Sequence, residues 1–170
     1  ASSKESGLQD SGKATVAALQ ELAVECSVNK VFASEAIDWI VDEMLQVHGG
    51  YGYVHEYDIE GAYRDARINR IWEGTSEINR MIITGSLLKR AMDGSLPLRP
   101  EIKKITDELM ARRGMREVPE GLLAVEKGTI DNARKMTLFA AGVAAQKYLA
   151  KLQDQQEILA WIADMVIQTY

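Results

Sequence analysis

An uninterrupted helical pattern over residues 13–48 constrains the fold more than any other feature of the sequence. Apolar residues recur there at three- and four-residue steps, and the stretch contains neither glycine nor proline. Gly49 and Gly50 follow it, as glycine commonly does at the C-terminal end of a helix. The pattern predicts one long helix, or two nearly collinear ones. The predicted apolar stripe consists of Leu19, Leu22, Cys26, Ala33, Ile37, Ile40, Met44 and Val47.

The rest of the 170-residue chain also favours helix over strand. Proline occurs three times, aromatic residues make up 6% of the chain, and no segment alternates apolar with polar residues. A chain of this length can bury a sizeable core. We therefore predict an all-α fold, an antiparallel helical bundle followed by additional C-terminal helices.

Composition divides the chain into four regions. Residues 1–13 are mostly polar or small, which predicts a linker or disordered tail and no signal peptide. Residues 14–92 form the predicted helical domain, and residues 93–100, which hold two of the three prolines, predict a linker. Residues 101–170 predict an extra C-terminal helical region. Because the last helical pattern reaches Tyr170 without a stop signal, we expect the chain to be a fragment at both ends.

Charge and composition argue against several functions. The net charge is −5, and no basic face of the kind that binds nucleic acid is evident. Two histidines and one cysteine are too few for a His- or Cys-rich metal site, so no metal is predicted. Cys26 lies on the predicted apolar stripe, and we expect it to be buried rather than nucleophilic. Phosphate-loop, G-x-S-x-G and H-E-x-x-H motifs do not occur.

The longest apolar run covers residues 136–145 and is too short to span a bilayer. A buried helix seam is favoured over a membrane-facing surface for this run. The small residues that would let another helix approach closely are Ala140, Ala141, Gly142, Ala144 and Ala145.

A candidate catalytic carboxylate stands at a break between two helical patterns. Trp72, Glu73 and Gly74 interrupt the pattern, and Thr75 then begins a new helix, since a hydroxyl can cap free N–H groups. These N–H groups could hold a polarised carbonyl while Glu73 removes a proton from the adjacent carbon. Burial against Trp72 would make the carboxylate a stronger base. The alternative is an ordinary acidic residue in a turn between helices.

A second candidate site lies at the end of the long helical pattern. Gly49 and Gly50 would let the backbone approach a flat ligand or a phosphate closely. Gln46 can both donate and accept hydrogen bonds at the edge of a ring or a ribose. A simple helix C-cap is the alternative interpretation.

Three arginines, Arg64, Arg67 and Arg70, are spaced three residues apart and share one side of a short helix. They form either a solvated face or an anchor that pairs with acids of the long helix.

Three motifs together resemble a known family. They are Q-V-H-G-G-Y-G-Y from Gln46, Y-R-D-A-R-I from Tyr63 and I-W-E-G-T-S-E-I-N-R from Ile71. In this order and at this spacing, within residues 14–92, they resemble the C-terminal helical domain of acyl-CoA dehydrogenases. Residues 100–170 resemble the extra helices of longer members related to very-long-chain acyl-CoA dehydrogenase.

The resemblance implies the oxidation of an acyl-CoA thioester, with FAD taking the β-hydride. It implies that Glu73 is the base for the α-proton and that Trp72 and Gly74 contact the substrate. It further implies two groups of FAD contacts. One of their residues, Glu77, is acidic where some relatives carry glutamine. The residues of these groups are Thr75, Ser76 and Glu77 for the phosphate, and Gln46, Val47, His48, Gly49 and Gly50 for the adenine end, across a subunit interface.

The family also implies a homo-oligomer, a dimer or a tetramer, with electron-transfer flavoprotein as electron acceptor. The protein would be cytoplasmic in a bacterium and mitochondrial in a eukaryote. Because the other domains of such an enzyme are not in this sequence, we expect the segment alone to bind FAD weakly or not at all and to be inactive. Alternatives are an acyl-CoA oxidase or other flavoenzyme of the superfamily, and a non-enzymatic helical interaction module.

Overall fold

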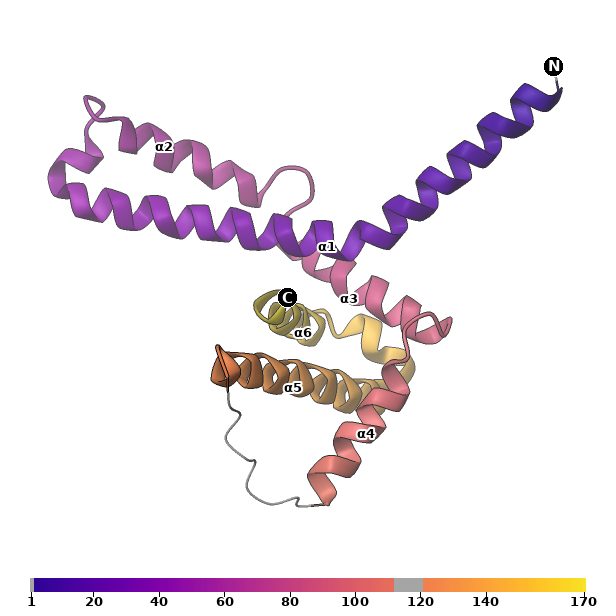
Figure 1. Ribbon diagram of the computed structural model, residues 1–170. Helices are drawn as coiled ribbons and strands as arrows, with labels where there is room; N and C mark the ends of the chain where they lie inside the picture. Colours follow the sequence, from indigo (N-terminus) through magenta and orange to yellow (C-terminus); the bar gives the residue numbers. More distant parts are fainter. Residues whose placement is uncertain (1, 112–120) are drawn as a thin grey trace.

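The computed structural model describes residues 2–111 and 121–170, with side chains from residue 12 onward apart from that of Leu109. The described residues form helices and connecting turns without any strand, which confirms the predicted all-α class (Figure 1). The elements in chain order are α1 (Ser2–His48), the 3-10 helix η1 (Gly49–Tyr53), α2 (Asp58–Arg67), the 3-10 helix η2 (Ile68–Arg70), α3 (Ser76–Met92), α4 (Leu98–Met110), α5 (Ala124–Tyr148), the 3-10 helix η3 (Leu149–Asp154) and α6 (Gln156–Thr169).

The predicted long helix is present as the single helix α1, but it is bent, so the alternative of two nearly collinear helices does not describe it. Figure 1 shows two straight limbs that meet at an angle, with α2 lying antiparallel along the second limb. The Arg90 guanidinium of α3 donates hydrogen bonds to the backbone carbonyls of Gln20 (2.9 Å) and Glu21 in α1. This contact joins the C-terminal part of α3 to the first half of α1.

The main core lies where α1, α3 and α6 meet. Val28, Val31 and Ile83 are almost completely buried there, and Ala163 of α6 has no exposed surface. Valine and alanine are small enough to let three helix backbones approach closely, and burial of each larger side chain contributes about 1.5–3 kcal/mol. This core fixes α3, and with it the turn that precedes α3.

The face of α1 that is buried differs from the predicted apolar stripe. The buried positions of α1 include Val24, Val28, Val31 and Val41, whereas every residue of the predicted stripe is exposed. Cys26 is exposed too, so its predicted burial was wrong. The physical reason is that α1 carries apolar residues on more than one face, and α2, α3 and α6 cover only the face with the smaller valines. The exposed stripe residues are Leu19, Leu22, Cys26, Ala33, Ile37, Ile40, Met44 and Val47.

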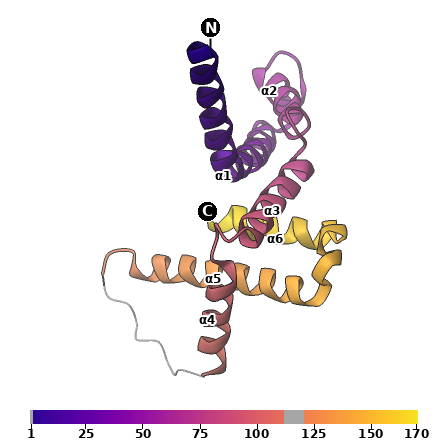
Figure 2. The same cartoon turned by 90° about the vertical axis from the view of Figure 1, so that its right-hand side faces the viewer.

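The C-terminal helices form a second layer. α5 and α6 are an antiparallel pair joined by η3, and α4 crosses α5 (Figure 2). A Cβ atom added to Gly142 would lie only 2.7 Å from Cγ2 of Ile102 in α4, so the crossing depends on this glycine. Ala144 is buried against α6 and η3. The predicted small-residue seam is thus confirmed. None of the described helices is long and apolar enough to cross a membrane.

Two predicted boundaries differ from the structure. Residues 2–13 belong to α1 and not to a linker or disordered tail, since extending a formed helix adds a hydrogen bond for each residue fixed. α4 begins at Leu98, inside the predicted linker 93–100, and Pro100 lies in its first turn, where proline needs no N–H donor. Residues 112–120, within the predicted C-terminal region, lie outside the described residues. The wider division into domains stays a prediction.

Candidate active site

The turn between η2 and α3 has an unusual backbone. Glu73 has φ 53° and Gly74 has φ 84°, so a non-glycine and a glycine residue are consecutive in the left-handed region. A non-glycine residue in this region costs of order 1 kcal/mol and persists where surrounding structure enforces it. Glu73 is exposed, and 54% of the Trp72 surface is exposed. The predicted burial of Glu73 against Trp72 is therefore not provided by the described residues, because Trp72 turns back to donate its Nε1–H to Oδ1 of Asn69 (3.2 Å).

The start of α3 is capped as the sequence predicted. Thr75 is the N-cap residue, and its Oγ1 accepts a hydrogen bond from the backbone N–H of Ile78 at 3.2 Å. Glu77 follows in the first turn, where the pKa of its carboxyl is lowered. The largest cause is a hydrogen bond from its own backbone N–H, which outweighs the opposing effect of burial, and the Thr75 hydroxyl adds to it. Ser76 is completely buried, and its hydroxyl has no hydrogen-bond partner among the described residues.

Asn79 connects the first turn of α3 back to the strained turn. Its side-chain Nδ2 donates to the carbonyl oxygens of both Gly74 (2.9 Å) and Thr75 (3.0 Å), and the residue is only 6% exposed. A Cβ atom added to Gly74 would lie 3.1 Å from this Nδ2 atom. Asn79 was not among the predicted site residues. The available signal was an asparagine, a poor helix former, one turn after the predicted Thr75 cap.

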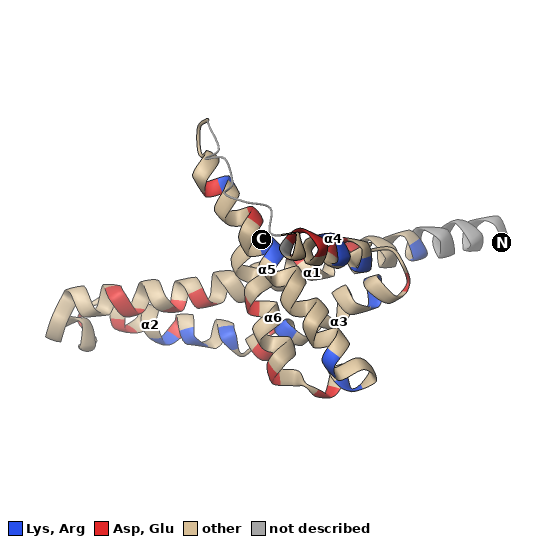
Figure 3. Cartoon of the chain, turned by 90° about the horizontal axis from the view of Figure 1, so that it is seen from below, with Lys and Arg blue, Asp and Glu red and all other residues tan. Residues whose placement is uncertain are grey.

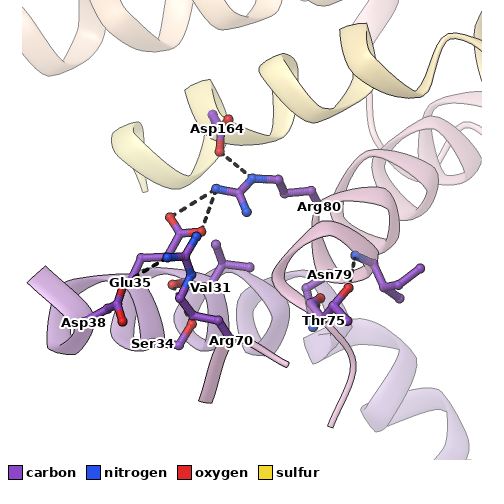
Figure 4. Close-up of polar contacts among 10 residues, drawn as sticks. Val31, Ser34, Glu35, Asp38, Arg70, Thr75, Asn79, Arg80 and Asp164 are labelled. Atoms are coloured by element: carbon purple, nitrogen blue, oxygen red, sulfur yellow. Dashed lines mark hydrogen bonds and ion pairs between the residues drawn. The ribbon is translucent and has the colours of Figure 1, made fainter. Parts of the chain in front are cut away.

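Arg80, next to Asn79, joins three helices (Figure 4). Its guanidinium lies 2.9 and 3.1 Å from the two carboxylate oxygens of Glu35 in α1 and donates from Nε to Asp164 Oδ1 in α6 at 2.7 Å. Burial acts against the charge on Arg80, but hydrogen bonds to Asp164 and Glu35 outweigh it and raise the pKa of the guanidinium. Arg80 therefore fixes α3 relative to both α1 and α6.

The arginine series of α2 and η2 contains an anchor to α1 at Arg70. Arg70 forms an ion pair with Asp38 of α1 at 2.9 Å, whereas Arg64 pairs with Glu60 of its own helix at 2.7 Å. Figure 3 shows acidic positions of α1 beside basic positions of α2. The prediction of an anchor to the long helix is thus confirmed for Arg70.

The second candidate site lies at the other end of α2, away from Glu73 (Figure 1). Residues 46–50 are all exposed, and His48 Nδ1 is 2.8 Å from the carbonyl oxygen of Met44. Gly49 has φ 58°, and a Cβ atom added to Gly49 or Gly50 would meet nothing within 4 Å. The described residues therefore do not bring the two candidate sites together, although the predicted Thr75 cap and the predicted glycine turn at the end of α1 are both present.

Comparison with known proteins places these two turns in a family. Residues 8–88 match the family described as "Acyl-CoA dehydrogenase, C-terminal domain", and residues 132–170 match a second family with the same description. The chain contains a C-terminal domain of the acyl-CoA dehydrogenase family. Both turns lie within the first matched segment, and α6 lies within the second.

Individual relatives agree with this family. A protein of Bacillus subtilis named "Probable acyl-CoA dehydrogenase" is 50% identical over 160 residues, which cover 94% of this chain and 27% of that protein. A solved acyl-CoA dehydrogenase of Bacillus anthracis, "complexed with FAD", has a TM-score of 0.86 and 53% identity, covering 94% of this chain and 26% of that chain. The bovine "Short-chain specific acyl-CoA dehydrogenase, mitochondrial" is 51% identical over 65 residues, 38% of this chain and 16% of that protein.

This acyl-CoA dehydrogenase C-terminal domain thus spans about a quarter of the length of the relatives that match most of it. No group of three or more histidine, cysteine, aspartate or glutamate residues that could hold a metal ion occurs within 2–111 and 121–170. The relatives do not support the narrower assignment to a very-long-chain type, since the chain-length class named among them is short-chain.

Proposed function

We propose that the chain is the C-terminal part of an FAD-dependent acyl-CoA dehydrogenase that oxidises an acyl-CoA thioester to the trans-2-enoyl-CoA. The observation that carries this proposal is the turn at residues 71–75. There an exposed carboxylate precedes a helix N-terminus, within a segment that matches the family. The left-handed backbone at Glu73 supports a functional role, since such strain concentrates at functional sites.

The residues of the turn have complementary roles in the proposed reaction. Glu73 removes the α-proton, and its backbone N–H holds the thioester carbonyl. The positive end of α3 favours the negative charge that develops on the thioester oxygen. Gly74 has no side chain to obstruct the substrate, and the exposed ring of Trp72 offers an apolar surface to the acyl chain. Carboxylates become stronger bases when an apolar substrate excludes water from them.

The residues present are compatible with FAD, which accepts the β-hydride when it is bound. Gly49 and Gly50 are open to solvent and allow close approach of a flat group, with Gln46, Val47 and His48 exposed beside them. At the start of α3 the side chains of Thr75 and Glu77 already make cap interactions. Only the buried Ser76 hydroxyl there lacks a partner among the described side chains, so we assign the phosphate contact mainly to backbone N–H groups.

Length supports the longer type of dehydrogenase. The 160 aligned residues make up 27% of the Bacillus subtilis relative, whereas 65 residues make up 16% of the bovine short-chain enzyme, so the bacterial protein is the longer one. The match at 132–170 supplies a second segment beyond the first. We propose that the enzyme is a member of the family with extra C-terminal helices. Its relation to the very-long-chain enzymes stays a hypothesis. Activity against acyl-CoA substrates of increasing chain length tests it.

The partners follow from this proposal. The enzyme would be a homo-oligomer in which residues 46–50 of one subunit complete the FAD site of another, and it would pass electrons to an electron-transfer flavoprotein. Its location would be the bacterial cytoplasm or the mitochondrion. Residues 46–50 and Glu73 lie at opposite ends of α2. In the proposed assembly, one FAD would therefore contact residues 46–50 of one subunit and the turn that carries Glu73 in another.

The decisive test is Glu73→Gln in the full-length enzyme. We expect turnover to fall roughly a thousandfold or more, because a positioned base contributes about 10²–10⁴-fold and the amide cannot accept the proton. Flavin content should be unchanged. Glu56→Gln, which changes an exposed glutamate in the turn before α2, is the matched control and should keep normal turnover. Normal turnover of Glu73→Gln would show that Glu73 is not the base.

The contribution of the missing part of the enzyme can be measured separately. We expect the 170-residue segment alone to bind FAD weakly or not at all, since the described residues provide only two separated turns. Absorbance in the flavin bands after incubation with FAD and gel filtration tests this. One bound flavin per chain would contradict the expectation.

A further inference from the structure

The turn that carries Glu73 requires a restraint that its own residues do not supply. Glu73 and Gly74 are both left-handed, and Glu73 is exposed, so no packing of its side chain holds the conformation. An L-residue relaxes from this region by about 1–2 kcal/mol unless other contacts prevent it. The carbonyl groups of Gly74 and Thr75 belong to the two peptide groups that follow this left-handed pair, so contacts that hold these carbonyls fix the chain directly after it.

Asn79 holds both of these carbonyl groups. A carboxamide nitrogen carries two hydrogens, and here Nδ2 contacts two consecutive carbonyl oxygens, at 2.9 and 3.0 Å. The backbone N–H of Asn79 also donates to Thr75 O at 2.9 Å. Aspartate at this position would have no donor when ionised, and serine would have only one. The contact is therefore specific to a buried carboxamide.

The helix that carries Asn79 is itself fixed. Arg80 pairs with Glu35 of α1 and Asp164 of α6, and Ile83, one turn after Asn79, has no exposed surface. The α1–α3–α6 core therefore fixes Asn79, and Asn79 fixes the carbonyl groups of Gly74 and Thr75, which follow Glu73.

We propose that Asn79 is a positioning residue for Glu73, which keeps the carboxylate in the orientation needed to remove the α-proton. This inference rests on the proposed function. Asn79 is buried and its polar nitrogen faces backbone, so it acts through the turn and not on the substrate. Misplacing a catalytic group by about 1 Å can lower a rate by about 100-fold, whereas substrate binding elsewhere in the enzyme is little affected. The loss should therefore appear in kcat more than in KM.

The test uses the full-length, flavin-loaded enzyme with three changes at one position. Asn79→Asp keeps the size of the side chain and removes the donors, Asn79→Ala removes the side chain, and Asn79→Gln restores the donors on a longer side chain. We expect kcat to fall roughly 10- to 100-fold in the first two with KM within about threefold, and partial recovery in the third. The primary deuterium isotope effect at the substrate α-carbon should rise, because proton removal becomes more rate-limiting.

Thr84→Val is the matched control. It removes a buried side-chain hydrogen bond of α3, from Thr84 Oγ1 to Arg80 O at 3.1 Å, that does not involve the turn. Its kcat and isotope effect should equal those of the wild type. Backbone amide exchange at residues 73–75 should accelerate in Asn79→Asp and not in Thr84→Val.

The outcomes separate the two proposals. If Glu73→Gln is inactive while Asn79→Asp keeps the wild-type kcat and isotope effect, the positioning role is wrong. If Asn79→Asp and Thr84→Val lose activity equally, with the same isotope effect, Asn79 has only a structural role and the inference is also overturned. If Glu73→Gln itself keeps turnover, the proposed function fails, and it does so independently of any result at position 79.

Discussion

The two chain reversals at the ends of α2 are built in different ways. The first, between α1 and α2, uses Gly49 at a positive φ and Gly52 in a close backbone approach. The second, between α2 and α3, places Glu73 at a positive φ and holds the following peptide with the side chain of Asn79. Glycine adopts the positive φ of the first reversal with little conformational strain. The second reversal keeps a non-glycine residue in an unfavourable conformation, and polar contacts offset the strain.

The difference shows that buried polar contacts fix the backbone of the second reversal and not that of the first. In the proposed function the first reversal only exposes backbone to a ligand, which needs no buried polar restraint, and residues 46–50 are exposed. The second reversal orients one carboxylate in the proposed function, which needs a fixed backbone, and the elements that fix it come from α1, α3 and α6. The C-terminal helices therefore take part in the proposed active site through Asp164 and Arg80, although they lie outside the motifs.

The largest effect on stability is expected for Gly52→Ala in the first reversal. The added Cβ atom would lie 2.6 Å from the carbonyl oxygen of Leu45 and 3.0 Å from Cβ of His48, so the backbone itself must move. We expect about 2–3 kcal/mol of destabilisation, as for overpacked sites. Chemical denaturation measures it. A change below about 0.5 kcal/mol, typical of a surface substitution, would mean that this reversal is not held by close packing.

A slightly smaller loss is expected for Arg80→Met behind the second reversal. The change removes charge-assisted hydrogen bonds to Glu35 and Asp164, each worth about 1.5–3 kcal/mol when buried. Both carboxylates are a third or more exposed and regain water, so we expect a total of about 2 kcal/mol. Lys135→Met, which removes the exposed ion pair with Glu108, is the control and should cost under about 1 kcal/mol. Equal losses of unfolding free energy in the two variants would show that Arg80 stabilises the fold no more than an exposed ion pair does.

These contrasts show what the sequence could predict. The helical class, the break at residues 72–74, the Thr75 cap and the small-residue seam at Gly142 all follow from local patterns, and the structure has them. Local propensity and spacing determine such features without knowledge of the neighbours.

Other features depend on contacts between distant segments. The buried face of α1 was assigned to the wrong residues, because the periodicity of an apolar stripe does not say which stripe a particular neighbour covers. The contact of Arg90 with the Gln20 carbonyl of α1 joins residues 70 positions apart along the chain. The Arg80 network joins residues of three helices that no local motif links. Its recognition required the packing of α1, α3 and α6.

Glycine substitutions compare the two reversals at closely matched positions. Gly74→Ala combines a φ of 84° with a Cβ atom 3.1 Å from Asn79 Nδ2, so we expect about 1.5 kcal/mol of destabilisation and a disturbed Asn79 contact. Gly49→Ala has a positive φ but open space, and we expect about 1 kcal/mol. Gly50→Ala has neither constraint and should be nearly neutral. Thermal denaturation should rank the three in this order, and a larger loss at Gly50 than at Gly74 would contradict it.

The smallest effect is expected from the pH dependence of Glu77. The pKa of this carboxyl is lowered in the folded state below its ordinary value of 4.5, chiefly by the hydrogen bond from its own backbone N–H. A lowered pKa means that its stabilisation is fully present above pH 4.5 and is lost as pH falls through the folded-state pKa. Because Glu77 is exposed, the contribution is a few tenths of a kcal/mol. Glu77→Gln should therefore be slightly less stable than wild type at pH 7, with the gap closing as the solution is acidified below pH 4.5. A gap of constant size down to pH 3 would show that the carboxylate charge does not stabilise the start of α3, and the restraint on the second reversal would then rest on uncharged contacts such as those of Asn79 and Thr75.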